Sequence, residues 1–349
     1  MQAEKRLTFT EYEKIDMPAW GFREGTPGWP MSMNFIFLNG GMGDYICWMT
    51  AIRWLAECAT WINGTLVCPN YFIELAEYWL KPYKNWKFKT YNELKDLDKP
   101  DDTPFRGPVV LQQESLNATG AHLLTCGWVY FTNKEGPPPG WENYSHIVKS
   151  DLDKVKLPFE LPEKFAVITT GVTTNTRKSN SAQWNYIIEY IHSKGLTPVF
   201  LGKRVVTTGN ARNIHTKWDE GFKFDLGLDL RDKTTLMQAA AVISRAKLIV
   251  GHDNGLLHLA GCTETPIVFG YSLASPEHRR PKRPAGKIYD VTLTDQELAC
   301  NHCQSKTNFV IGYNFRECYY GDNLCMKMLF ENEAIRWKRQ IDRALAESM

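Results

Sequence analysis

The chain has 349 residues, of which 43% are hydrophobic and 23% are charged, so it is long enough for one large hydrophobic core or two ordinary ones. This composition excludes collagen, low-complexity disorder and small disulfide-rich scaffolds. The 41 Lys and Arg against 39 Asp and Glu leave a net charge of +2, which predicts no general attraction to nucleic acid or anionic membranes. No apolar run reaches the roughly 18 to 20 residues that cross a bilayer, and no signal-peptide core opens the sequence. We therefore expect a soluble, cytoplasmic protein.

The first half of the chain alternates between strand and helix patterns. Residues 1–33 are rich in Pro, Gly and Trp without periodicity, which predicts an irregular arm. An apolar run ending at Leu38 then leads into a glycine turn at 40–44 and a helical pattern, as in a strand, tight turn and helix. Further strands over 65–67 and 109–111 and a helix over 71–80 complete a series typical of a parallel α/β sheet.

A second α/β series follows a charged segment at 151–164 that contains two prolines. Proline disfavours continuous helix or sheet, so we place a domain boundary near residue 157. Two domains, 34–157 and 158–325, are therefore expected, and 326–349 predicts one amphipathic helix. In the second domain we expect strands over 165–170, 198–201, 248–251 and 266–269, and helices over 184–191, 236–244 and 256–260.

The second domain contains a polar turn between a strand and a helix. The strand ending at Gly251 is followed by His252, Asp253 and Asn254, and Gly255 opens the helix. Backbone N–H groups and the dipole at such a helix start bind phosphate oxygens. A purely structural interpretation remains open, with Asp253 as an N-cap and a histidine of the helix, His258, satisfied in the core.

The turn in the first domain carries an aspartate. The sequence Gly40-Gly41-Met42-Gly43-Asp44 has Asp44 where a dinucleotide-binding turn would have its third glycine. A carboxylate there would repel a pyrophosphate, so we expect no dinucleotide at this turn. Asp44 could instead accept a proton from an incoming hydroxyl, although an ordinary helix-capping aspartate remains the alternative.

Taken together, the two turns resemble the pattern of glycosyltransferase family 9, which includes the lipopolysaccharide heptosyltransferases of the GT-B fold. The resemblance rests on GGMGD at 40–44, on DNGLLHLA at 253–260 against the family's DTGLxHLA, and on PIVFG at 266–270. A further match is the strand end at Thr170 followed by Arg177 and Lys178. Family members place a phosphate-binding lysine there, ahead of a helix that carries a tryptophan, here Trp184.

The resemblance implies two Rossmann-like domains facing a cleft, with the C-terminal helix returning to the first domain. It also implies an inverting, metal-independent transfer from a nucleotide-diphosphate sugar to an acceptor hydroxyl, with Asp44 as general base beside Gly40, Gly41 and Gly43. Fixed donors near the leaving diphosphate would stabilise its growing negative charge. The donor-binding residues implied by the resemblance are Thr170, Arg177, Lys178, Asp253, Asn254, Gly255, Leu256 and His258, with the amide of Leu257.

The donor and the acceptor stay open at this point. Lys203 and Arg204 follow Gly202, where relatives often bring an acidic group to the nucleotide ribose, so ADP-heptose is not carried over. A glycan or lipopolysaccharide is the expected acceptor. The alternatives are a hydroxymethylated DNA base and a nucleotide-sugar-binding module that has lost transfer. A basic segment, 278–283, is either a solvated loop, a contact for donor phosphates or a contact for a nucleic-acid backbone.

Four of the nine cysteines form a cluster in the sequence. Cys300, Cys303, Cys318 and Cys325 have a CxxC spacing followed by two further cysteines, which allows a tetrahedral structural zinc site. Packed reduced thiols or a disulfide are the alternatives. We expect no cofactor to be required for catalysis.

Overall fold

The computed structural model divides the chain into two compact units, Met1–His146 and Ile147–Met349. Within the described residues, no helix is both long enough and apolar enough to cross a membrane. The described residues are 31–37, 41–58, 60, 62–90, 93, 109–111, 140, 144–171, 177, 179–206, 216–217, 221–281, 283, 286–303, 318 and 321–347.

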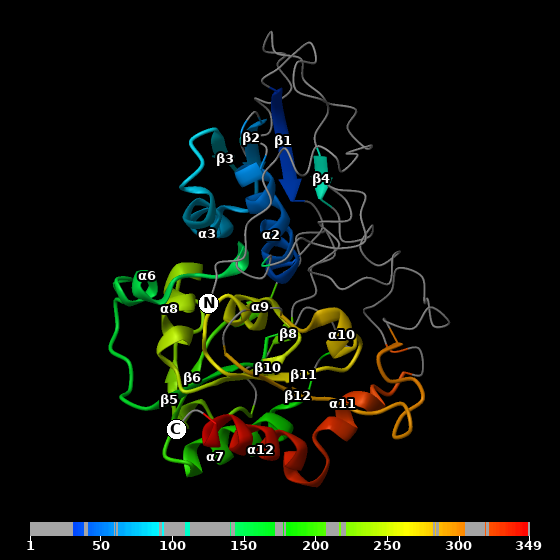
Figure 1. Cartoon of the computed structure of the whole chain (residues 1–349). Helices are drawn as coiled ribbons and strands as arrows, with labels where there is room; N and C mark the ends of the chain where they lie inside the picture. Colours follow the sequence, from blue (N-terminus) through cyan, green and yellow to red (C-terminus); the bar gives the residue numbers. More distant parts are fainter. Residues whose placement is uncertain are drawn as a thin grey trace. The chain divides into compact units, whose positions relative to one another are not determined.

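The first unit contains a parallel four-stranded sheet in the order β3-β2-β1-β4 (Figure 1). Its first strand begins inside the segment expected to be an irregular arm, because Met31 already pairs with Ile62 of the neighbouring strand. The elements of this unit are β1 (Met31–Phe37), α2 (Met42–Cys58), β2 (Ile62–Val67), α3 (Asn70–Leu80), β3 (Trp86–Lys89) and β4 (Val109–Leu111).

Aromatic side chains hold the first unit together. Trp86 stacks on Phe35 with ring centroids 5.1 Å apart. Gly64 makes this contact possible, since a Cβ at that position would lie 2.5 Å from the Trp86 ring. On the helical side, Tyr45 of α2 stacks on Phe37 at 4.7 Å. These contacts fix the start of α2 directly after the strand that precedes it.

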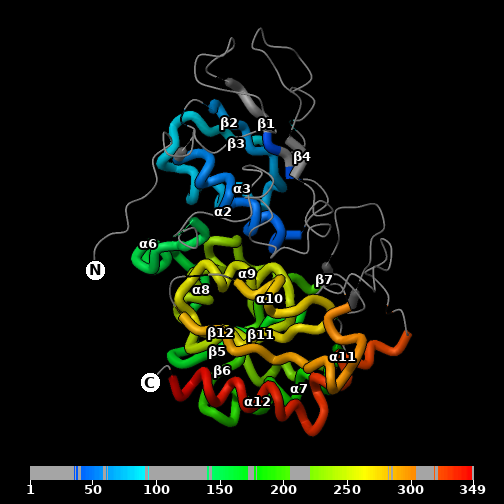
Figure 2. Tube along the Cα trace, turned by 45° about the vertical axis from the view of Figure 1, so that its right-hand side comes forward, coloured from blue at the N-terminus to red at the C-terminus, as the bar shows by residue number. Residues whose placement is uncertain are grey.

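The second unit contains a parallel six-stranded sheet in the order β12-β11-β10-β5-β6-β9. Helices cover both faces: α8, α9 and α10 lie on one side of the sheet, and α7 and α12 lie on the other (Figure 2). The elements are α6 (Lys149–Asp153), β5 (Phe165–Thr169), α7 (Ser181–Ser193), β6 (Thr197–Phe200), β7 (Val205–Val206), β8 (Thr216–Lys217), η4 (Phe224–Leu226), β9 (Leu228–Asp229), α8 (Leu236–Arg245), β10 (Ile249–His252), α9 (Gly255–Gly261), β11 (Ile267–Gly270), α10 (Pro276–Arg279), β12 (Ile288–Val291), α11 (Leu324–Leu329) and α12 (Glu331–Ala346).

The division between the units falls at residues 146 and 147, ahead of the position near 157 expected from the prolines. The backbone explains the difference. Ile147 N donates to Cys262 O at 2.8 Å, and the short helix α6 packs against α8, so residues 147–157 already belong to the second unit.

The C-terminal segment corrects two expectations. Instead of one helix over 326–349, α11 and α12 are separated at Phe330, and left-handed backbone follows at residues 332–334. The expected return of this helix to the first domain is also corrected. In the structure α12 packs on α7, β11 and β12 and so belongs to the second unit.

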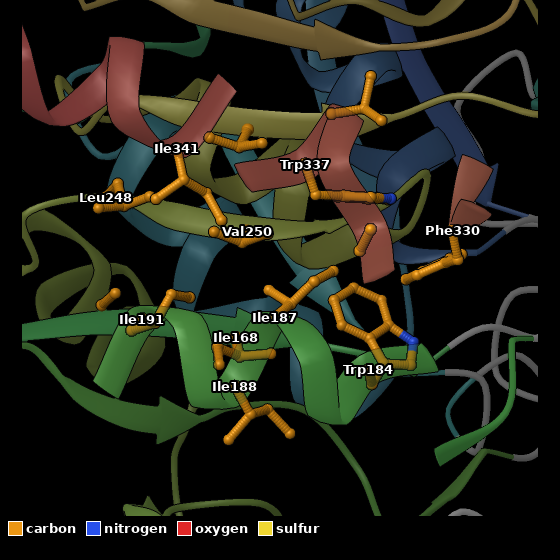
Figure 3. Close-up of a cluster of buried hydrophobic side chains, with 14 of the residues drawn as sticks. Ile168, Trp184, Ile187, Ile188, Ile191, Leu248, Val250, Phe330, Trp337 and Ile341 are labelled. Atoms are coloured by element: carbon orange, nitrogen blue, oxygen red, sulfur yellow. The ribbon is translucent and has the colours of Figure 1, made fainter. Parts of the chain in front are cut away.

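The core of the second unit explains this placement of α12. Figure 3 shows Trp337 and Ile341 pointing toward the apolar side chains of α7 and of the central strands. Trp184 of α7 lies 5.5 Å from Trp337 between ring centroids. Burial of an aromatic side chain contributes much of the stability of such a core, so α12 completes the second unit.

Candidate functional site

Three successive residues between β10 and α9 are hydrogen-bonded to the end of β5 and to the segment that follows it. Asn254 Nδ2 donates to Thr169 Oγ1 at 3.1 Å. Arg177 Nη1 donates to Asp253 O at 2.7 Å. Ser179 Oγ and His252 Nε2 share a hydrogen bond at 3.4 Å. These three links join residues distant in the sequence into one polar surface at the carboxyl end of β5 and β10, the edge where parallel α/β sheets bind ligands.

Close packing of the two strands supports this surface. Gly251 pairs with Thr169 across β10 and β5, and a Cβ at Gly251 would lie 2.5 Å from Thr169 Cγ2 and 2.8 Å from Thr169 O. Glycine is therefore required at the end of β10 for the strands to approach at this distance. Thr170, the residue expected to offer a hydroxyl, is buried beside them.

The helix start differs in detail from the expected phosphate cradle. Asn254, not Asp253, is the N-cap of α9, and its Oδ1 accepts hydrogen bonds from Leu256 N at 3.0 Å and Leu257 N at 3.2 Å. Two of the three amides expected to bind phosphate are therefore engaged by the chain's own side chain. The structural interpretation of Asp253 as a cap is wrong, because this carboxylate has other partners.

Asp253 is a buried, ionised carboxylate among cationic groups. Burial alone would raise its pKa, but the charge of Arg279, a hydrogen bond from His258 and the charge of Arg177 together hold the pKa of this carboxyl well below its ordinary value. His258 Nε2 lies 3.4 Å from Asp253 Oδ1, and Arg177 Nη1 lies 3.5 Å from Oδ2. Asp253 thus holds the guanidinium of Arg177 in place at the polar surface.

His252 is a core residue and stays neutral. Its ring meets Trp184, Phe330 and Trp337 at centroid distances of 5.3, 5.5 and 5.1 Å. Burial lowers the pKa of this imidazole to about 3. The residue before the polar turn is therefore anchored by the aromatic core and carries no charge near neutral pH.

The arginine side chains of the basic segment, 278–283, bind other residues of the second unit or are buried in it. Arg283 donates to the carbonyls of Ala260 at 2.9 Å, Thr263 at 2.8 Å and Thr265 at 2.6 Å. Arg280 pairs with Asp290 of β12, and Arg279 is buried. The expectations of a solvated loop and of a nucleic-acid contact fail for Arg279 and Arg283, which the fold buries or binds internally. Arg280 is paired with Asp290 but keeps 43% of its side chain exposed.

The residues after Gly202 also have internal partners. Arg204 Nη2 lies 3.0 Å from Asp229 Oδ2, and Arg204 N donates to Asp232 Oδ2 at 3.1 Å. Asp229 binds Arg231 through both of its carboxylate oxygens, at 2.9 Å each. The sequence therefore missed an acidic group near this strand end. Arg204, taken as an argument against ADP-heptose, pairs with Asp229, which it shares with Arg231.

Asp44 lies in the first turn of α2 in the first unit. Its Oδ2 accepts a hydrogen bond from Gly41 N at 2.7 Å, so the carboxylate caps the helix from inside the first turn. The side chain is buried except for 8% of its surface. The hydrogen bond to Oδ2 thus holds the Asp44 carboxylate in place. Both the capping and the general-base interpretations require a fixed carboxylate.

Several expected site residues lie outside the described part of the chain. They are Gly40, Lys178 and, in the basic segment, Lys282.

The four clustered cysteines form no disulfide. Burial, together with the nearby thiols of Cys303, Cys318 and Cys300, raises the pKa of the Cys325 thiol to about 12, so these three cysteines lie within electrostatic reach of Cys325. Among the residues that the structure describes, however, no three His, Cys, Asp or Glu side chains are arranged to hold a metal ion. The set of thiols fits zinc or iron chemically, whereas their arrangement here is not that of a closed site.

Two pairings in this site had no clear signal in the sequence. Ser179 and His252 stand 73 positions apart, and nothing in either local pattern predicts their contact. Arg279 was noted only as part of a basic run, although it is the largest cationic influence on the pKa of Asp253. Tertiary packing buries Arg279, and the periodicity of the sequence around it gives no sign of this.

Comparisons with known proteins identify the family and the fold of the chain. The model for glycosyltransferase family 9 (heptosyltransferase) matches residues 131–312, which is more than half of the chain. No curated protein matches the chain.

Solved structures share the fold at low sequence identity. The iron-containing dodecameric glycosyltransferase TibC from enterotoxigenic E. coli H10407 aligns with a TM-score of 0.64 and 14% identity, over 91% of this chain and 77% of that one. TibC in complex with ADP-D-beta-D-heptose aligns with a TM-score of 0.62 and 15% identity, over 94% and 82%. The E. coli ADP-heptose lps heptosyltransferase II aligns with a TM-score of 0.52 and 12% identity, over 90% and 99%. The two units therefore form a GT-B fold.

Proposed function

The chain belongs to glycosyltransferase family 9, and from this premise we propose that it moves a sugar from a nucleotide-diphosphate donor to a hydroxyl of a glycan or lipopolysaccharide acceptor. The observation that carries the proposal is the triple link between residues 252–254 and the segment after β5. These links support the proposal because they join Thr169, Arg177 and Ser179 to the turn at the strand edge where α/β folds bind nucleotides.

The donor is proposed to be ADP-heptose or a related nucleotide sugar. Support comes from TibC, which was solved with ADP-D-beta-D-heptose, and from the pairing of Arg204 with Asp229, which reduces the positive charge after Gly202. Arg177 is oriented by Asp253 and would meet the diphosphate as a fixed cation. Because Asn254 occupies the amides of Leu256 and Leu257, the main phosphate contact is assigned to Arg177 and Lys178.

The reaction is proposed to be a direct, inverting displacement. Asp44 would accept the proton of the acceptor hydroxyl as that oxygen bonds to the anomeric carbon and the bond to the diphosphate breaks. The cations would stabilise the charge that grows on the leaving diphosphate, so no metal ion is needed for this step.

The DNA alternative has less support than the glycan acceptor. It relied on the basic segment at 278–283, and Arg280 and Arg283 there bind Asp290 and the carbonyls after α9. A contact with a nucleic-acid backbone needs such cations at the surface.

The test is transfer from nucleotide sugars, with Asp44→Asn as the inactive control. A thermal-shift screen against ADP, UDP, GDP and CMP first identifies the nucleotide. Transfer from the matching sugar donor onto deacylated lipopolysaccharide core oligosaccharide is then followed by mass spectrometry, with and without EDTA. We expect Asp44→Asn to reduce transfer about 10²- to 10⁴-fold while nucleotide binding persists. Equal rates of the variant and the wild type would contradict the assignment of Asp44 as general base. Nucleotide binding without any transfer by the wild type would favour the inactive binding module.

We also propose that Cys300, Cys303, Cys318 and Cys325 bind a structural metal ion, either zinc or iron. Four thiols are a suitable donor set, and TibC is iron-containing. Metal analysis of the purified protein tests this proposal, with Cys300→Ser and the buried Cys262→Ser as matched variants. Metal lost only from Cys300→Ser supports the cluster, whereas a metal-free wild type contradicts it.

A further inference from the structure

The starts of two helices meet at one edge of the sheet in the first unit. Strands β1 and β2 are neighbours and run parallel, and each is followed by a helix, α2 after β1 and α3 after β2. The first turns of these helices touch, since the rings of Tyr45 and Phe72 pack edge to face with centroids 5.6 Å apart. Asp44 precedes Tyr45 and Tyr71 precedes Phe72, so both side chains lie at this carboxyl edge.

Tyr71 is unusual among the aromatic residues of this unit. The rings around it are buried, with Phe72 at 0% and Tyr45 at 4% exposure, whereas Tyr71 is 46% exposed. Partial burial raises the pKa of the Tyr71 phenol, and its neighbours Tyr45, Cys68 and Asp44 raise it further. An exposed aromatic ring thus lies within electrostatic reach of the Asp44 carboxylate.

The surface next to Tyr71 is acidic. Glu74 is exposed and stands three residues after Tyr71, the spacing that places two side chains on the same face of a helix. Glu77 is also exposed, and α3 contains no Lys or Arg. An aromatic ring beside a carboxylate offers a flat apolar surface together with a strong hydrogen-bond acceptor. Phosphate groups would be repelled by these carboxylates.

We propose that Tyr71 and Glu74 form an acceptor subsite that receives an uncharged saccharide. The inference rests on the proposed function, because it takes Asp44 as the base. The apolar C–H face of the acceptor ring would lie on the Tyr71 ring, and a ring hydroxyl would donate to the Glu74 carboxylate. These contacts would hold the reacting hydroxyl toward Asp44. The same charges disfavour a nucleic-acid acceptor at this surface.

The test separates acceptor binding from donor chemistry. Tyr71→Ala, Tyr71→Phe and Glu74→Gln are assayed for transfer from ADP-heptose onto a dephosphorylated core oligosaccharide that contains no acidic sugar, and for donor hydrolysis without acceptor. Tyr186→Ala and Glu189→Gln are matched controls, because this pair has the same spacing on α7 and Tyr186 is 39% exposed. Thermal unfolding is recorded for every variant.

We expect Tyr71→Ala to raise the acceptor KM about three- to tenfold, the scale of one aromatic contact. Donor KM, donor hydrolysis and the melting temperature should stay at wild-type values, and Tyr71→Phe should stay within about twofold because it keeps the ring. Glu74→Gln should raise the acceptor KM about tenfold, the scale of one lost charged hydrogen bond. The two control variants should behave as wild type.

Three results would overturn the subsite. The first is an acceptor KM of Tyr71→Ala equal to that of Tyr186→Ala. The second is better use of the phosphorylated than of the dephosphorylated oligosaccharide. The third is transfer to hydroxymethylated duplex DNA in place of the saccharide. In the first two cases wild-type transfer to the saccharide still supports the proposed function, whereas transfer to DNA would also replace its glycan acceptor. An absence of both transfer and donor hydrolysis in the wild type would instead overturn the proposed function itself, and the subsite with it.

Discussion

The indole of Trp337, on the last helix, meets the imidazole of His252 edge to face, with centroids 5.1 Å apart and ring planes at 89°. His252 immediately precedes Asp253 and ends β10. The C-terminal helix therefore packs directly against the base of the turn that carries the donor-site residues. We therefore expect that truncation of the Trp337 side chain and protonation of the His252 imidazole both affect this site.

Acidification should destabilise the second unit through His252. The folded pKa of about 3 lies below the ordinary value of 6.5, so between these values the unfolded chain binds a proton that the folded chain does not. Stability therefore falls as the pH drops below about 6.5, by about 2 kcal/mol from pH 7 to pH 5. Urea unfolding at both pH values checks this, and His252→Phe should show a smaller loss. An unchanged pH dependence in His252→Phe would assign the effect elsewhere.

Removing the hydroxyl of Ser179 should affect the donor site more than the fold. Ser179→Ala deletes one hydrogen bond to His252 Nε2, which costs about 1 kcal/mol of stability. The segment after β5 loses one of its three links to the turn, so we expect the donor KM to rise several-fold with an unchanged acceptor KM. Ser193→Ala, which removes an exposed hydrogen bond at the end of α7, is the matched control. Equal donor KM values in the two variants would contradict a positioning role.

Arg279 should be required for the charged state of Asp253. Arg279→Gln leaves a buried carboxylate without its largest cationic influence, which should lower the free energy of unfolding by roughly 3 kcal/mol. Adding Asp253→Asn should restore part of that loss, because the unpaired charge is removed. Arg280→Gln breaks a more exposed pair with Asp290 and should cost less. Calorimetry of the wild type, Arg279→Gln, Asp253→Asn, their double variant and Arg280→Gln gives the comparison, and additive losses in the double variant would rule out this coupling.

Trp337 and Ile335 provide a test of where α12 packs. Trp337 is fully buried, whereas Ile335 is 44% exposed on the same helix. Trp337→Ala should destabilise the second unit by about 3 to 5 kcal/mol through the cavity it leaves. Ile335→Ala should change stability by less than about 1 kcal/mol. Similar losses for the two variants, measured by urea unfolding, would show that α12 does not seal this core.

The sequence predicted the elements that contain long apolar runs or clear helical periodicity. The strands at β4, β5, β6, β10 and β11 and the helices α3, α7, α8 and α9 agree with the expected ranges to within a few residues. It did not predict β9 or β12, which are short and carry Asp229 and Asp290 among their few residues. Such strands form because a neighbouring strand offers hydrogen-bond partners, and local composition does not report this.

The site was predictable in part for the same reason. Asp253, Asn254 and the glycines around them stand in a recognisable strand-to-helix turn. Their partners could not be read from the sequence, because Ser179, Arg279 and Trp337 reach the turn only through tertiary packing. The basic segment illustrates the limit: its composition suggested a surface patch, but Arg283 binds carbonyl oxygens after α9.

The late position of Trp337 in the chain has a consequence for biosynthesis. The sheet of the second unit can align once β12 is made, but His252 lacks its contact with Trp337 until α12 has also been made. A nascent chain that ends before α12 would expose the apolar surface that Trp337 covers. Folding of the second unit is thereby tied to the synthesis of α12.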